Sequence, residues 1–185
     1  MVSVLSLWLP ILLSAIAVFF ASSIIWMFLP WHKSDYRGVS DEAAAGAALR
    51  DLAPGGYNIP HLESRGDMGK PEGKAKFEKG PVAFLFVAPK GMPSMGPMLA
   101  KWFVFAVIVA ACVAYLAGVG LAPGADYMRV FRITSTATWL AYGFAYVSDS
   151  IWYFRPWHLT WKNLFDALIY GLLTGGIFGW LWPAA

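Results

Sequence analysis

The stretch Trp102–Ala122, WFVFAVIVAACVAYLAGVGLA, contains 21 residues without a charged side chain. Two similar charge-free runs occur in the chain, Val2–Leu29 with 28 residues and Ala167–Ala185 with 19. A helix needs about 20 apolar residues to cross the hydrocarbon core of a bilayer, so each run is long enough to span one. The sequence therefore predicts an all-α integral membrane protein.

The composition of the whole chain agrees with this prediction. Of its 185 residues, 58% are hydrophobic and 14% are charged, and the mean hydropathy is +0.55. A soluble domain of this size has too small an interior to bury so much apolar surface. These values exclude a disordered chain, a disulfide-stabilised secreted domain and a soluble cytosolic enzyme. The single cysteine, Cys112, lies within an apolar run and has no partner for an intrachain disulfide.

We expect four transmembrane helices and one extramembrane insert. The predicted boundaries, in residue numbers, are 1–32 for the first helix, 33–97 for the insert, 98–122 for the second helix, 130–154 for the third and 163–182 for the fourth. The third helix is the least apolar, because Arg132 and Asp149 leave only 16 uncharged residues between them. Long basic side chains and aromatic rings near its ends still suit the two interfaces of a bilayer.

The insert contains sequence patterns of its own. A serine followed by two acidic residues and a run of alanines predicts a short helix at about 40–52. The apolar segment 82–87 is too short to span a membrane and predicts a strand, for which 57–59 is a candidate partner. The charged and glycine-containing segment 63–79 predicts a solvated loop with at most one helical turn.

One motif, I-W-x-F-x-P-W-H, occurs twice in the chain. The segments Ser22–His32 and Ser148–His158 are identical at seven of eleven positions, and the identities include two Trp, a Pro and a His. Such scarce residue types rarely coincide by chance. We interpret the match as an internal duplication that produces two tandem transmembrane hairpins of the same orientation, related by an axis along the membrane normal. The insert then belongs to the first hairpin alone.

The duplication predicts equivalent stripes of small residues on the second and fourth helices. The paired positions are Ala106, Ala110, Ala114 and Gly118 in one helix and Ala167, Gly171, Gly175 and Gly179 in the other. Small side chains at every fourth position let helix backbones approach closely, which is a main source of helix association in lipid. We expect these stripes to form the contact between the two halves.

Basic residues close to the helix ends are distributed unequally. Six flank the insert and the loop between the third and fourth helices: Lys33, Arg37, Lys90, Lys101, Arg155 and Lys162. Only Arg129 and Arg132 flank the opposite side. The positive-inside rule therefore places the insert in the cytoplasm of a bacterium, with both termini outside the inner membrane.

His32 and His158 occupy equivalent positions in the repeat and are candidate ligands for a metal, a haem, a pigment or a lipid headgroup. The residues that could complete a metal shell are His61, Asp35 and Glu63. The alternative is that each histidine belongs to an interfacial anchor, since tryptophan rings settle at the depth of lipid headgroups. The tryptophans in question are Trp26, Trp31, Trp152 and Trp157. No metal-binding spacing such as H-E-x-x-H occurs, so we predict no metal site, and the sequence requires no cofactor.

Asp149 and Asp166 are the acidic residues that fall inside or at the edge of predicted membrane helices. Ionisable groups within a membrane are costly and commonly functional, so a proton or cation site is one interpretation. The other is a structural ion pair. Lys162 precedes Asp166 by four residues, and Arg155 is close to Asp149 in sequence.

Several short motifs together resemble a group of uncharacterised four-helix bacterial inner-membrane proteins. They are Leu-Pro-Ile-Leu at 9–12, Leu-Pro-Trp-His-Lys-Ser-Asp-Tyr at 29–36, Pro-Ser-Met-Gly at 93–96 and the closing Gly-x-x-x-Gly-Trp-Leu-Trp-Pro. The resemblance covers nearly the whole chain and implies a bacterial source and four helices. Because the group has no established activity, no site residue follows from it.

The sequence contains no nucleophile elbow, phosphate-binding loop or dinucleotide fingerprint, so no motif gives positive evidence for an enzyme. We favour a non-catalytic accessory or scaffolding subunit of a larger membrane complex of respiratory or photosynthetic type. The reason is that few polar residues are available to line a pathway, whereas glycine stripes, aromatic residues and a basic loop suit packing against protein and anionic lipid. Its partners would be membrane lipids and other membrane subunits or further copies of itself. Nucleic acid is not expected as a partner, because the basic residues are spread over loops that flank membrane spans. The alternative is a small-solute or ion transporter or channel that works as an oligomer. A transporter needs polar groups that converge on a cavity, whereas a subunit needs an apolar outer face.

Overall fold

The computed structural model describes all 185 residues apart from the side chain of Arg65, and the chain divides into two compact units. One unit comprises Met1–Tyr36 and Ser94–Ala185, and the other comprises Arg37–Pro93. The chain is mainly helical. The second unit falls within the predicted insert, so the insert is a compact body with its own contacts.

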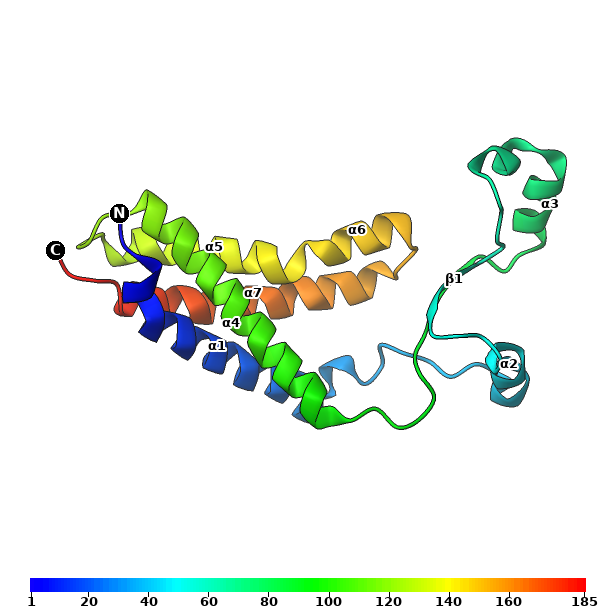
Figure 1. Cartoon of the computed structure of the whole chain (residues 1–185), viewed down its shortest axis with the longest axis horizontal. Helices are drawn as coiled ribbons and strands as arrows, with labels where there is room; N and C mark the ends of the chain where they lie inside the picture. Colours follow the sequence, from blue (N-terminus) through cyan, green and yellow to red (C-terminus); the bar gives the residue numbers. More distant parts are fainter. The chain divides into compact units, whose positions relative to one another are not determined.

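The first unit is a bundle of helices that form two hairpins (Figure 1). In the first hairpin, α1 (Trp8–Ser23) packs against α4 (Met95–Gly120), and α1 is preceded by the 3-10 turn η1 (Val4–Leu7) and continued by the π-helical turn η2 (Ile24–Phe28). In the second, α5 (Tyr127–Gly143) and α6 (Ala145–Trp152) lie beside α7 (Trp157–Trp180). Both chain termini lie at the end of the bundle where α4 turns into α5 (Figure 1).

Two segments of the bundle, Val4–Phe28 and Met95–Gly120, are long and apolar enough to cross a membrane. The third and fourth predicted membrane helices differ from the predicted boundaries. The third helix is interrupted at Phe144, between α5 and α6, whereas a continuous helix was predicted. The fourth begins at Trp157 and not near residue 163, because Pro156 suits the start of a helix and the polar residues that follow continue it.

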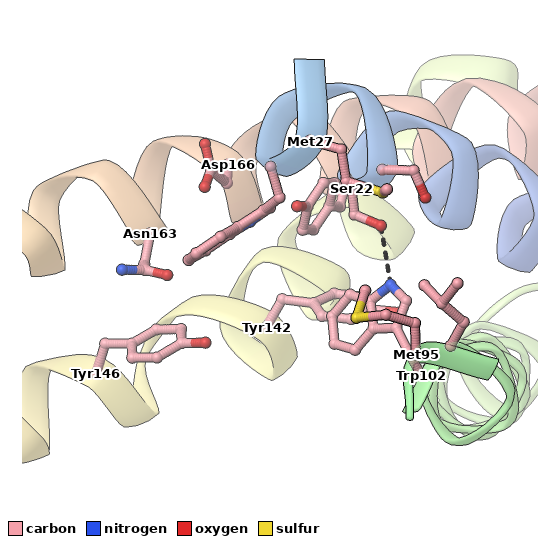
Figure 2. A pocket seen from close by; sticks show the side chains of 12 residues that line it. Ser22, Met27, Met95, Trp102, Tyr142, Tyr146, Asn163 and Asp166 are labelled. Atoms are coloured by element: carbon pink, nitrogen blue, oxygen red, sulfur yellow. Dashed lines mark hydrogen bonds between the residues drawn. The ribbon is translucent and has the colours of Figure 1, made fainter. Parts of the chain in front are cut away.

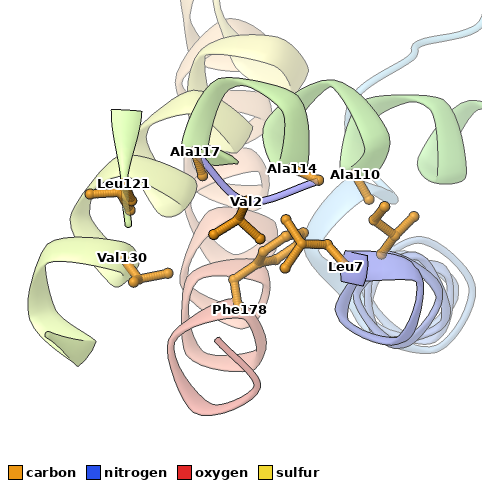
Figure 3. Close-up of a cluster of buried hydrophobic side chains, with 9 residues drawn as sticks. Val2, Leu7, Ala110, Ala114, Ala117, Leu121, Val130 and Phe178 are labelled. Carbon is orange, nitrogen blue, oxygen red and sulfur yellow. The ribbon is translucent and has the colours of Figure 1, made fainter. Parts of the chain in front are cut away.

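The bundle is held together by buried apolar clusters. One lies at the end that carries the termini and draws side chains from all four helices (Figure 3). Phe178 and Leu7 are fully buried there, and Ala114 and Ala117 leave room for them. A second cluster, which includes Val113 and Tyr142, fills the centre of the bundle. The small stripe on α4 is buried in this interior.

The glycine stripe on α7 lies against α5. A Cβ added at Gly171 would lie 2.7 Å from the carbonyl oxygen of Ser135, and one added at Gly179 would lie 2.7 Å from the ring of Tyr127. The two helices approach so closely that only glycine fits. The stripe therefore joins α7 to its own hairpin partner. The prediction that it joins the two halves is wrong for its three glycines, because all of them face residues of α5.

The second unit contains two short helices and a two-stranded sheet. Its elements are α2 (Glu42–Leu49), β1 (Gly55–Ile59), the 3-10 turn η4 (Arg65–Gly69), α3 (Pro71–Lys79) and β2 (Ala83–Val87). The strands pair antiparallel, with Tyr57 opposite Leu85. Asp41, and not Ser40, caps α2, because its side chain accepts a hydrogen bond from the backbone N–H of Ala44.

Helix α3 replaces part of the loop predicted at 63–79. It has a proline at its first position, an acidic residue in its first turn and two lysines in its last turn, all of which favour a helix. Gly80 ends it with a positive φ of 60°. Gly73 lies inside α3, where the helix packs against the backbone of Asp67 so closely that an added Cβ would clash with it. Close packing, and not flexibility, requires this glycine.

Candidate functional site

His32 is buried between two carboxylates in the first unit, just after the first helix. Its Nδ1 lies 2.5 Å from Oδ2 of Asp35, and its Nε2 lies 2.8 Å from Oδ2 of Asp166. The three side chains are only 3 to 4% exposed. Because Asp166 belongs to α7, His32 connects the end of the first helix to the fourth.

The local backbone explains how His32 reaches this position. The π-helical turn η2 ends at Leu29, which is extended, and the 3-10 turn η3 (Pro30–His32) follows. The chain therefore folds back, and the ring of Trp26 stacks on the imidazole of His32 with centroids 3.7 Å apart and an interplanar angle of 4°. Irregular helical turns of this kind are frequent at functional sites.

Lys162 completes the charge network. Its Nζ donates hydrogen bonds to Oδ1 of Asp35 at 2.6 Å and to the carbonyl oxygen of Trp31 at 2.7 Å. Burial disfavours the ionised form of Asp35, but hydrogen bonds from Lys162 and His32 outweigh burial and hold the pKa of Asp35 below its usual value. The predicted pairing of Lys162 with Asp166 is wrong, because η3 brings His32 and Asp35 onto this face of α7.

The two contacts of His32 determine how many protons the network holds. An ionised carboxylate can only accept hydrogen bonds, so an imidazole that donates to two of them carries a proton on both nitrogens. If one carboxyl were protonated instead, the total charge would be the same. His32, Asp35 and Asp166 together carry a charge of −1, and Lys162 brings the sum to zero. Loss of one proton removes a hydrogen bond and leaves the network negative.

His32 and His158, the predicted cofactor ligands, occupy different environments. Both ring nitrogens of His32 face carboxylate oxygens, so neither offers a lone pair to a metal or a haem iron. His158 is exposed in the first turn of α7, and no contact joins it to His32 in the side chains that the structure describes. Among those side chains, no group of three or more His, Cys, Asp or Glu could hold a metal ion.

A cavity of about 310 Å³ lies beside Asp166, between the helices of the bundle (Figure 2). Residues from α1, η2, α4, α5, α6 and α7 line it. Five of them are aromatic: Trp26, Trp102, Tyr142, Tyr146 and Tyr170. In the cavity wall, Nε1 of Trp102 donates a hydrogen bond to Oγ of Ser22 at 2.8 Å (Figure 2). The volume is within the range of small-molecule sites in proteins.

The lining of this cavity is mainly apolar and aromatic, and its polar side chains include Ser22, Ser23, Asn163 and Asp166. Figure 2 shows Asn163, Tyr146 and Asp166 among the side chains that line the cavity. Oδ2 of Asp166 contacts His32, but its Oδ1 is buried and makes no hydrogen bond of normal geometry in the part of the chain described. A buried oxygen without a donor is costly, so this atom is available to a ligand.

Asp149, the other carboxylate predicted to lie in a membrane helix, is half-buried in α6 and does not line the cavity. The predicted ion pair between Asp149 and Arg155 is absent from the described side chains. The guanidinium of Arg155 lies instead over the ring of Tyr146, 4.9 Å from its centroid. The chain reverses at Phe154, where φ is 56°, and this reversal directs Arg155 towards the ring.

The predicted interfacial tryptophans occupy two kinds of position. Trp152 and Trp157 are exposed on the outside of the second hairpin. Trp26 and Trp31 are also part-exposed, but each has one face on the charge network, against His32 and Lys162 respectively. These two are therefore components of the site as well as candidate anchors.

Comparison of the chain with protein-family models, curated proteins and solved structures finds no match. No relative therefore indicates a function for it. The function is inferred from the site itself, and the resemblance to four-helix bacterial inner-membrane proteins stays a prediction.

Proposed function

We propose that this chain is a transporter of a small solute in the bacterial inner membrane, and that His32 and Asp166 couple solute movement to a proton. The observation that carries the proposal is the position of the charge network beside the cavity. Asp166 belongs to both, since one of its oxygens contacts His32 and the residue lines the cavity. A solute that reaches Asp166 therefore alters the group that holds the proton.

Coupling follows from the energetics of charge at a buried site. With its proton, the network of His32, Asp35, Asp166 and Lys162 is neutral. Without the proton it carries a net negative charge, which is unfavourable in a medium of low dielectric constant unless another group compensates. A solute that changes the charge balance at Asp166 therefore also changes the free energy of protonating the network, and this linkage is one requirement for coupled transport.

We infer four membrane-spanning segments, namely η1–α1–η2, α4, α5–α6 and α7. Helix α7 has 24 residues and is about 36 Å long, which is enough to cross a bilayer. Its charged residues Lys162 and Asp166 are paired inside the bundle, so they do not face lipid. The outer faces of all four segments carry exposed apolar side chains: Leu12, Phe20, Ile108, Leu116, Ile133, Leu140, Leu168 and Leu172.

The orientation of the chain in the membrane is inferred from its basic residues. We propose that the insert is cytoplasmic and both termini are outside, as the distribution of basic residues indicates. We also propose that the two hairpins are diverged copies of one ancestor. The repeated motif follows the first helix of each hairpin, but His32 is buried in a 3-10 turn and His158 is exposed at the start of α7. In this proposal only the first copy retains a site.

An accessory or scaffolding subunit of a larger membrane complex is the second candidate function. The exposed apolar faces favour it, because large side chains such as Phe20 and Leu116 suit contact with another subunit as well as with lipid. Purification in a mild detergent tests it. Stoichiometric membrane partners that remain bound would support a subunit, whereas a homo-oligomer would agree with a transporter.

Transport itself is tested with purified protein in liposomes under an imposed pH gradient. Four labelled solutes represent the main classes: a sugar, a zwitterionic amino acid, a carboxylate and an organic cation. We expect gradient-dependent accumulation of at least one, abolished by Asp166→Asn and retained by Asp149→Asn. The second variant is a matched control, because Asp149 is a carboxylate outside the cavity lining. If no class accumulates above the level in protein-free liposomes, the proposed function is wrong.

A further inference from the structure

The charge of the cavity restricts the ligands that it can hold. Asp166 is the only charged residue among the described residues that line it, and its side chain is 4% exposed. Its Oδ1 accepts no hydrogen bond of normal geometry from the described side chains, so a ligand with a positive group would stabilise this buried oxygen. An anion would be repelled by the same carboxylate, and a neutral apolar ligand would leave its oxygen unpaired.

The aromatic lining favours the same kind of ligand. The faces of tryptophan and tyrosine rings carry negative potential and attract cations, most strongly where water is excluded. The rings also pack against one another: the ring centroid of Tyr142 lies 5.8 Å from that of Trp102 and 5.4 Å from that of Tyr170. Met27 and Met95 add polarizable side chains that adapt to ligands of different shape.

We infer that the cavity binds a lipophilic organic cation, an amine or quaternary ammonium that carries alkyl or aromatic groups, and that this cation replaces the proton of the network. The inference rests on the proposed function and names the class of its solute. The cationic centre lies against Oδ1 of Asp166, and its apolar groups contact the aromatic rings.

The exchange balances in charge. The protonated network of His32, Asp35, Asp166 and Lys162 is neutral, and a monovalent cation would raise the total to +1. Release of the proton shared by His32 and Asp166 to water returns the total to zero. Only an N–H or O–H bond breaks, and no redox partner is needed. Tyr146 and Tyr170 also line the cavity, and a phenol is uncharged at neutral pH, so neither enters the charge balance.

The test uses the purified full chain in detergent, with tetraphenylphosphonium as the probe and tetraphenylborate as an anion of the same shape. Binding is followed by quenching of tryptophan fluorescence, and proton release is followed with a dye in weak buffer. We expect saturable binding of the cation only, release of about one proton for each cation bound, and weaker binding at lower pH.

Variants separate the charge from the aromatic contribution. Asp166→Asn should weaken cation binding by at least about tenfold. Trp102→Leu should weaken it, whereas Trp102→Phe, which keeps a ring face, should weaken it less. Asp149→Asn should have no effect. Each variant is compared at equal monodispersity and thermal stability, so that a loss of binding is not a loss of fold.

Equal binding of the cation and the anion, an unchanged affinity in Asp166→Asn, or binding without proton release would overturn the inference. Such a result is distinguishable from failure of the proposed function. If a sugar, amino acid or carboxylate accumulates in the liposomes and the cation does not bind, the transporter proposal stands and the ligand class is wrong. If no solute accumulates at all, the transporter proposal fails.

Discussion

Asp35 lies between the buried imidazole of His32 and the ammonium group of Lys162 and stabilises both. It accepts hydrogen bonds from Nδ1 of His32 and from Nζ of Lys162, and its side chain is 3% exposed. Its pKa in the folded protein is lower than the unfolded value near 3.8, because these hydrogen bonds outweigh the effect of burial. The stabilisation is therefore fully present above the unfolded pKa and is lost as the pH falls through the folded pKa.

We expect Asp35→Asn to lower the free energy of unfolding at neutral pH by about 1–3 kcal/mol, because the amide leaves Lys162 without its counter-charge. The difference between the two proteins should shrink in acid, below the unfolded pKa of Asp35. Thermal unfolding in one detergent, followed by circular dichroism from neutral to acid pH, measures both effects. The double variant Asp35→Asn with Lys162→Met should recover part of the loss. A difference from the native chain that does not change with pH would contradict the assigned role of Asp35.

His32 and His158 also indicate what can be predicted at the level of residues. The repeat makes both histidines candidate ligands, and it gives no reason to expect different roles for them. Their environments differ because one follows a π-helical turn and the other begins α7. The contact between His32 and Asp166 could not be predicted either. The two residues are 134 positions apart, and a single sequence contains no signal for such a pair. The sequence made Asp166 a candidate site residue because of its position in an apolar segment, but it did not predict the partner His32.

At the level of elements, the contact between α5 and α7 depends on glycine. A Cβ added at Gly175 would lie 2.9 Å from Cβ of Ser135 and 3.0 Å from the ring of Phe131. We expect Gly175→Leu to destabilise the bundle by about 1–3 kcal/mol, because the larger side chain forces the helices apart. Leu172→Ala is the control, since Leu172 is 48% exposed on another face of α7. Melting temperatures in the same detergent provide the comparison, and equal values for the two variants would be inconsistent with this packing.

The helices themselves could be predicted to different degrees. Long apolar runs correctly indicated α1 and α4, because hydrophobicity alone decides where such segments reside. The start of α7 was misplaced because Lys162 and Asp166 resemble flanking charges until their buried partners are known. Helix α3 was missed because Gly73 was interpreted as a loop residue, whereas its packing against the backbone of Asp67 is a tertiary contact.

At the level of the whole molecule, the topology prediction is that the insert is cytoplasmic. A single cysteine introduced at Gly38, in a Cys112→Ala background, should react with an impermeant thiol reagent only after the cells are opened. A cysteine introduced near the N-terminus, at Ser3, should react in intact cells. The physical reason is the excess of basic residues on the insert side of the predicted helices. Labelling of position 38 from outside intact cells would reverse the assignment.

The duplication makes a second prediction at this scale. In an experimentally determined structure, the hairpin of α1 and α4 should superpose on that of α5, α6 and α7 after a rotation of roughly half a turn about the membrane normal. The small stripes on α4 and α7 should then coincide. Hairpins related by an inverted axis, or helices that do not overlap in length, would show that the repeated motif is not a duplication.

In the proposed function, solute movement is coupled to proton movement at His32 and Asp166. The most direct measurement is the internal pH of proteoliposomes that contain a trapped pH-sensitive dye, recorded while the sugar, amino acid, carboxylate and organic cation are each added outside. We predict that at least one solute, the organic cation if the inferred ligand class is correct, changes the internal pH with the native chain and with Asp149→Asn. We predict no change with Asp166→Asn. A native chain that gives the same trace as protein-free liposomes for all four solutes, or an Asp166→Asn variant that retains the response, would contradict the claim.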